Sequence, residues 1–84
     1  MSSFPISTLK ISQLARLLRE TRTNAGLTQQ QVADAIDLSV PIYGRIERAS
    51  MIPAEHTLRS ICAVLKLDYE AVVASMRDDE SVVH

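Results

Sequence analysis

Residues 28 to 48, TQQQVADAIDLSVPIYGRIER, restrict the possible fold of this chain more than any other segment. Thr28 and Gln31 have the T-x-x-Q spacing of a capping box, in which each side chain satisfies a free backbone N–H group of the other residue. Ser39 is a favourable N-cap for a following helix, and Pro41 stands in its first turn, where a missing N–H does no harm. The segment therefore predicts two short helices joined by a tight turn.

Apolar side chains at intervals of i, i+3, i+4 and i+7 predict further helices on both sides of this segment. We expect the first to begin at a Ser12 cap and to stop at Gly26, because glycine accepts the left-handed conformation that ends helices. Its periodic positions are Leu14, Leu17, Leu18 and Thr21. Those of a helix after Pro53 are Leu58, Ile61, Cys62 and Leu65. A last helix is expected after an Asp68 cap, and with no strand alternation the fold class is all-α.

The length of 84 residues allows one domain with a small core. We assign residues 12–76 to this domain, residues 1–11 to an N-terminal leader and residues 77–84 to a flexible acidic tail. No apolar run approaches the roughly 20 residues that a membrane span needs. The first residues lack the basic and then apolar layout of a secretion signal. We therefore expect a cytoplasmic protein without a membrane partner.

The residue types that carry most enzyme and metal chemistry are sparse in this sequence. A single cysteine, Cys62, excludes an internal disulfide and a multi-cysteine zinc site, and its position on an apolar helix face favours a buried hydrophobic role. His56 and His84 lack companions at metal-ligand spacing. No nucleophile–base arrangement and no glycine-rich phosphate loop occurs. We expect neither an enzyme nor a cofactor.

The distribution of charge is more informative than its total. The net charge of −1 does not by itself indicate nucleic-acid binding. Residues 1–48 carry six basic and four acidic side chains, whereas residues 49–84 carry three basic and six acidic ones. The basic half contains the two-helix segment, which favours an anionic partner for it; a chance division of surface charge is the alternative.

Residues 12 to 76 resemble the lambda-repressor-like, Cro/Xre type of helix-turn-helix domain. The resemblance rests on L-R-x-x-R, G-L-T-Q, the V-A pair at the helix crossing, and Y-x-R-I-E. It implies a compact five-helix fold whose second and third helices form the helix-turn-helix, a unit that lays its second helix in the major groove of DNA. It also implies a structural ion pair between Arg22 and Glu47, which would orient the first helix against the third.

The family pattern places the candidate DNA contacts on the second and third helices. They are Gln29, Ser39, Val40, Pro41, Ile42, Gly44, Arg45 and Arg48. Gln29 and Ser39 would bind phosphates and thereby set the register of the protein on the DNA. The Arg45 guanidinium would pair with O6 and N7 of guanine, and residues 40–42 would pack on thymine methyl groups. The alternatives are a solvated Arg45 paired with Glu47 or Asp34, and a protein contact through residues 40–42.

Some positions depart from the family pattern. Ala49 stands where a glycine usually closes the third helix, and an alanine in a left-handed conformation there would cost about 1 kcal/mol. Asp37 replaces a common glycine in the turn. Val40 and Pro41 replace polar side chains that commonly contact base edges.

One such domain makes few phosphate contacts, so we expect a homodimer that places two recognition helices about one turn of DNA apart on a palindromic operator. The candidate dimer interface is Tyr69, Val72, Val73 and Met76 on the last helix. The alternative is that these residues complete the monomer core. The predicted function is a sequence-specific transcriptional regulator of repressor, autoregulator or antitoxin type. The alternative function is a module that binds a protein partner through the apolar residues 40–42 and 51–52.

Overall fold

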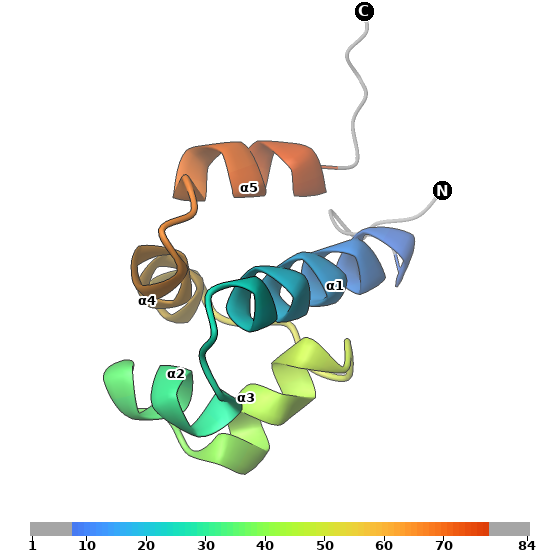
Figure 1. Cartoon of the computed structure of the whole chain (residues 1–84). Helices are drawn as coiled ribbons and strands as arrows, with labels where there is room; N and C mark the ends of the chain where they lie inside the picture. The colour runs from blue at the N-terminus through green and yellow to red at the C-terminus, as the bar shows by residue number, and fades with distance from the viewer. Residues whose placement is uncertain (1–7, 78–84) are drawn as a thin grey trace, which may run out of the picture.

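The computed structural model describes residues 8–77, and this part of the chain forms five helices and no strand (Figure 1). The helices are α1 (Thr8–Asn24), α2 (Gln29–Ala35), α3 (Val40–Glu47), α4 (Glu55–Leu65) and α5 (Tyr69–Met76). The all-α, five-helix prediction is therefore confirmed. None of these helices is long and apolar enough to cross a membrane.

Helix α1 runs through the middle of the molecule, with α2 and α3 on one side and α5 on the other (Figure 1). It contacts α3, α4 and α5, while α2 packs against α3 and α4. As a result, the α2–α3 unit and α5 lie at opposite ends of the view in Figure 1. These two ends of the molecule present separate surfaces to solvent.

The core is built from the apolar faces that the periodicity predicts. Every described helix contributes to it, and α2 and α3 meet where Val32 and Ala33 are both fully buried. The small side chain of Ala33 lets the two helices approach closely. The other core residues are Leu14, Leu18, Tyr43, Ile46, Leu58, Ile61, Cys62, Leu65, Val72 and Met76.

The start of α1 differs from the prediction. The helix runs from Thr8, so Ser12 lies inside it and is not its N-cap. A tertiary contact stabilises the early turns, because the Lys10 Nζ donates a hydrogen bond to the Ser75 carbonyl oxygen at 3.1 Å, near the end of α5. A cation is favoured at that end of a helix. Residues 1–7 and 78–84, which hold most of the predicted leader and tail, lie outside the described part of the chain.

Four helices end in the same left-handed turn, although only one of them has a glycine there. The turn residues are Gly26, Asp37, Ala49 and Lys66, with φ values of 75°, 59°, 63° and 61°. In each turn, two backbone N–H groups donate to carbonyl oxygens of the last helical turn, as in a Schellman motif. The predicted stop at Gly26 is confirmed, and Ala49 does adopt the costly conformation.

Candidate nucleic-acid interface

Both predicted caps of the α2–α3 unit are present. The Gln31 N–H donates to Thr28 Oγ1 at 3.0 Å, and the Thr28 N–H donates to Gln31 Oε1 at 2.8 Å, which completes the capping box. The Ser39 Oγ accepts a hydrogen bond from the Ile42 N–H at 3.4 Å. Helix α3 therefore starts at Val40, with Pro41 in its first turn. The local sequence signals account for where both helices begin.

A buried ion pair joins α1 to the end of α3. Arg22 donates from Nε to Glu47 Oε2 at 2.7 Å and from Nη2 to Oε1 at 3.0 Å, so the contact is bidentate. Gln29, at the start of α2, donates from Nε2 to the same Oε1 at 3.0 Å. One carboxylate thus ties three helices together. Because such paired bonds have a strict geometry, they hold α3 at a defined angle to α1 and α2.

The environment of Glu47 shifts the pKa values around it. Only 1% of the Glu47 surface is exposed. Burial raises its pKa, but the hydrogen bonds from Arg22 and Gln29 outweigh this effect, and the pKa of Glu47 lies below its ordinary value. The bond to Glu47 in turn raises the pKa of Arg22. Burial, followed by the nearby Glu47 carboxylate, raises the pKa of Tyr43. The Tyr43 hydroxyl itself has no hydrogen-bond partner of acceptable geometry in the described structure.

Arg19 is a member of this network that the sequence analysis missed. Its Nη1 donates to the backbone carbonyl oxygen of Glu47 at 2.9 Å, from 28 positions earlier in the chain. A cation at this point also complements the negative end of α3. The L-R-x-x-R pattern puts Arg19 one turn before Arg22, and that spacing was the available signal, since residues three apart share a helix face.

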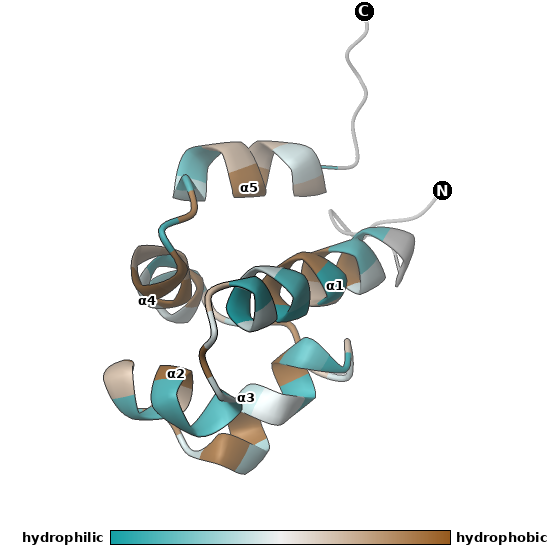
Figure 2. Ribbon diagram, viewed as in Figure 1, coloured by the Kyte–Doolittle hydropathy of each residue, from teal (hydrophilic) through white to brown (hydrophobic). Residues whose placement is uncertain are grey.

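The predicted DNA contacts differ in how accessible they are. Ser39, Pro41, Arg45 and Arg48 are exposed. Gln29, Val40 and Ile42 are half-buried, and of these Val40 packs against the hydrophobic core. In Figure 2 the apolar first turn of α3 lies at the edge of the molecule that is farthest from α5.

Gly44 is also predicted as a DNA contact on the outer side of α3, but it is buried in the structure. A Cβ atom added there would lie 3.0 Å from Arg48 Nη1 and 3.7 Å from Gln29 Oε1. The Arg48 guanidinium therefore folds back across the backbone of α3 and covers Gly44. Helical periodicity carries no information about the Arg48 side chain that lies over Gly44.

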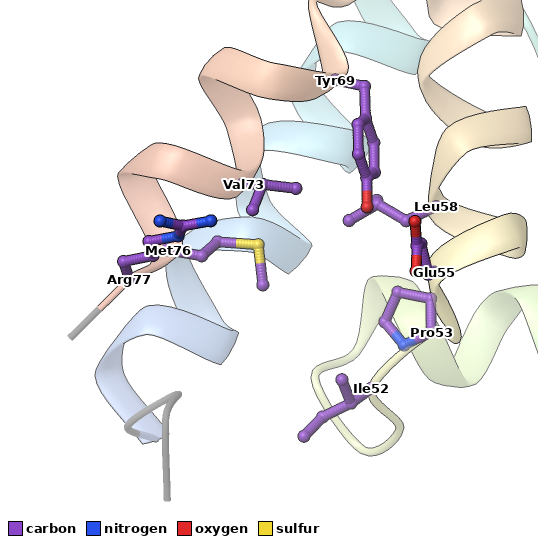
Figure 3. A pocket seen from close by; sticks show the side chains of 8 residues that line it. All are labelled: Ile52, Pro53, Glu55, Leu58, Tyr69, Val73, Met76 and Arg77. Atoms are coloured by element: carbon purple, nitrogen blue, oxygen red, sulfur yellow. The ribbon is translucent and has the colours of Figure 1, made fainter.

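The predicted dimer residues also divide into two pairs. Val72 and Met76 are 5% and 7% exposed and belong to the monomer core, as the alternative reading proposed. Tyr69 and Val73 are half-buried, and they face Ile52 across a groove of about 260 Å³ between α5 and the loop that follows α3 (Figure 3). Ile52 is one of the two exposed large hydrophobic side chains in residues 8–77, with 51% of its surface exposed.

A cation contacts Tyr69, one of the residues that line this groove. The Arg59 guanidinium lies over the Tyr69 ring, 4.3 Å from its centroid. It also donates from Nε and Nη2 to Glu55 Oε2 at 3.2 and 3.1 Å. The ring of Tyr69 is thereby held against α4, on one wall of the groove, by a cation–π contact.

Comparison with known families and structures agrees with this geometry. A family model described as a helix-turn-helix domain matches residues 13–76. The chain belongs to this family. The match covers all five helices from the second turn of α1 onward, and the resemblance to the Cro/Xre type of domain is confirmed. No curated protein matches the sequence significantly.

Several solved structures share the fold. The clp gene regulator ClgR from Corynebacterium glutamicum has a TM-score of 0.72 and 24% identity, covering 80% of this chain and 71% of that one. The restriction-modification controller protein C.AhdI from Aeromonas hydrophila has a TM-score of 0.71 and 22% identity, covering 77% of this chain and 94% of its own. An HTH_3 family transcriptional regulator from Vibrio cholerae has a TM-score of 0.69 and 30% identity; the match covers 80% of this chain but 38% of that protein.

Proposed function

We propose that this helix-turn-helix protein is a sequence-specific DNA-binding transcriptional regulator that inserts α3 into the major groove. The observation that carries the proposal is the exposed outer side of α3, which is held at a fixed angle by the bidentate Arg22–Glu47 pair. Membership in the family and the likeness to transcriptional regulators support the same class of function. A regulator of repressor, autoregulator or antitoxin type fits a domain of this size.

Arg45 is the residue we assign to base recognition. It is exposed in the last turn of α3 and forms no ion pair within residues 8–77. Both carboxylates that the sequence offered as partners are engaged elsewhere: Glu47 binds Arg22 and Gln29, and Asp34 accepts a hydrogen bond from Gln30. The Arg45 guanidinium is therefore available to pair with O6 and N7 of a guanine.

Phosphate contacts are proposed for Arg48 and Ser39, and a positioning role for Gln29. Arg48 is exposed and lies over α3 beside Gln29, where a positive charge would meet the sugar–phosphate backbone next to the groove. The amide of Gln29 is occupied by Glu47, so its main effect is to hold α2 against α3. Such contacts set the register of the protein on DNA without reading its sequence.

A homodimer on a palindromic operator is proposed for the active form, with a revised interface. The apolar surface next to α5 is made by the exposed Ile52 and the half-buried Tyr69 and Val73, while Val72 and Met76 support it from the core. Joining two copies through this groove would leave both α3 helices exposed, because α5 and α3 lie at opposite ends of the molecule (Figure 1). The proposed dimer would place its two recognition helices about one turn of DNA apart, which is the separation that a palindrome requires.

The experiment that tests the proposal is selection of bound sequences from random duplex DNA, followed by a salt titration on the selected site. We expect an inverted repeat and binding that weakens steeply with salt, since several phosphates release counterions. Arg48→Ala should reduce the slope of log K against log salt by about 1, and Arg45→Ala should abolish sequence preference. Arg16→Ala on the exposed surface of α1 is the matched control, and it should leave the selected consensus unchanged.

Failure of the selection would favour the second candidate, a module that binds a protein partner. The net charge of −1 and the exposed Met51 and Ile52 are the observations in its favour. Enrichment of no consensus, or binding that salt does not weaken, would overturn the DNA-binding proposal. Loss of the consensus in the Arg16→Ala variant would show that the effects of the α3 variants are not local.

A further inference from the structure

The accessible side of α3 presents a narrow set of chemical groups. Val40 is half-buried and packs on the core, and Gly44 lies under a guanidinium, so each is less accessible to a base than the exposed Pro41. The reading face that remains consists of Pro41, Ile42 and Arg45, and Arg48 lies beside it at the proposed phosphate contact. Pro41 is exposed, and Ile42 is half-exposed without packing on the core. None of these four side chains has a hydrogen-bond acceptor.

This chemistry limits which bases can be matched in the major groove. Adenine and cytosine each present an amino group there, which needs an acceptor. Guanine presents two acceptors, which an arginine satisfies, and thymine presents a methyl group, which an apolar side chain satisfies. An amino group placed against Pro41 or Ile42 would lose its water without gaining a partner, and that is costly. The reading face thus both attracts methyl groups and excludes amino groups.

We infer that Pro41 and Ile42 are specificity-determining residues that read the C5-methyl group of pyrimidines, beside a guanine read by Arg45. The inference rests on the proposed DNA-binding function and adds the chemical feature that is recognised. Pro41 suits this role because its ring is rigid and loses little conformational entropy on contact. The Ser39 cap bond to the Ile42 N–H holds the neighbouring backbone in place.

The inference also predicts a response to cytosine methylation. Thymine and 5-methylcytosine carry the same methyl group, whereas uracil and cytosine lack it. At a contacted position we expect affinity to fall in the order thymine, 5-methylcytosine, cytosine. Replacement of thymine by uracil changes only the methyl group, so it isolates the contact from every hydrogen bond of the base pair.

The test uses the full chain and a synthetic duplex of the selected site, with one thymine at a time replaced by deoxyuridine. Removal of a contacted methyl group should weaken binding about fourfold, the value expected for one buried carbon group. In Ile42→Ala or Pro41→Ala the same replacement should have little further effect at its contacted position. Arg16→Ala, on the exposed surface of α1, is the matched control and should keep the full uracil penalty. Circular dichroism and thermal unfolding confirm that each variant is folded.

The outcomes separate the inference from the function on which it rests. A uracil penalty that disappears in the Ile42→Ala or Pro41→Ala variant supports methyl recognition. If the duplex binds but no thymine is sensitive to uracil, or if both variants keep the penalty, the methyl inference fails and DNA binding stands. If no duplex is selected at all, both fail together.

Discussion

Two arginine–glutamate pairs of this protein have the same chemistry and opposite surroundings. In the α2–α3 end, the Arg22 and Glu47 side chains are 13% and 1% exposed, and they connect α1 to α3. In the α4–α5 end, the Arg59 and Glu55 side chains are 54% and 70% exposed, and they lie one turn apart on a single helix. Both arginines donate through Nε and Nη2.

The difference shows where charge determines the geometry of this fold and where it does not. Glu47 cannot be hydrated, so its three side-chain hydrogen bonds specify how α1, α2 and α3 meet. Glu55 and Arg59 remain in water, and exposed pairs of this kind contribute little. The α4–α5 end is held together by apolar packing, and it leaves an apolar groove. The α2–α3 end is held by a polar network, and it leaves an exposed helix.

The largest effect is expected from Arg22→Ala. This change leaves the Glu47 carboxylate buried without its ionic partner, and breaking a buried pair in this way costs about 3–5 kcal/mol. The free energy of unfolding, measured by urea titration followed by circular dichroism, should fall by an amount in that range. A loss of less than about 1 kcal/mol would mean that the pair is solvated like a surface pair.

A double variant separates the unpaired charge from lost packing. In Arg22→Met with Glu47→Leu, neither charge of the buried ion pair is left, and such replacements of buried pairs are often neutral or stabilising. We expect the double variant to be more stable than Arg22→Ala. If it is equally unstable, packing or the bond from Arg22 Nη1 to the Leu27 carbonyl oxygen accounts for the loss.

The second-largest effect is expected from acidification, which should lower the free energy of unfolding through Glu47 in the α2–α3 end. The pKa of Glu47 is lower in the folded protein than its ordinary value of 4.5, so the linked stabilisation is complete above that value. It is lost as the pH falls through the lower folded-state pKa. Urea titrations from neutral to strongly acidic pH should record this decline, and Glu47→Gln should reduce it. Glu55→Gln is the matched control and should leave the decline as it is.

A smaller, opposite effect is expected at the end of α3. Ala49 has a φ of 63°, and glycine at this position removes a strain of about 1 kcal/mol. Ala49→Gly should therefore raise the free energy of unfolding by about this amount in thermal or urea unfolding. Lys66→Gly, in the equivalent turn after α4, should give a similar gain. A gain in only one of the two would show that the ends of the molecule differ in backbone strain as well as in charge.

The smallest effect is expected from Arg59→Ala. The pair with Glu55 is exposed, so its removal should leave the unfolding midpoint unchanged within error. The arginine also lies over Tyr69, and its loss would free that ring at the wall of the groove. The measurement is thermal unfolding of Arg59→Ala and Arg22→Ala under the same conditions, with the two midpoints compared. Equal losses in the two variants would remove the distinction between the two ends.

Sequence reasoning located the elements well because the signals for them are local. The capping box at Thr28, the Ser39 cap and the Gly26 stop each involve residues within one turn of each other, and all are present. The start of α1 was wrong because its early turns carry no strong local signal. They are supported by the bond from Lys10 to Ser75, which lies 65 positions away in the chain.

The candidate site was predicted in outline and corrected in detail. Periodicity shows which side of α3 faces outward, but it does not show that Arg48 covers Gly44 or that Val40 packs on the core. Likewise, the last helix was identified, but Val72 and Met76 complete the monomer core. Each correction concerns which side chain covers another, and that depends on how helices pack.

The sequence by itself determined the five-helix composition, the position of the two-helix unit and the Arg22–Glu47 pairing that the family resemblance implied. Caps, turns and apolar repeats act over a few residues, so the order of the residues is enough to specify them. Only the tertiary structure decided which apolar residues remain accessible, how Arg19 and Gln29 support Glu47, and where the groove lies. Accessibility is a property of packed surfaces, and packing brings together side chains that are far apart along the chain.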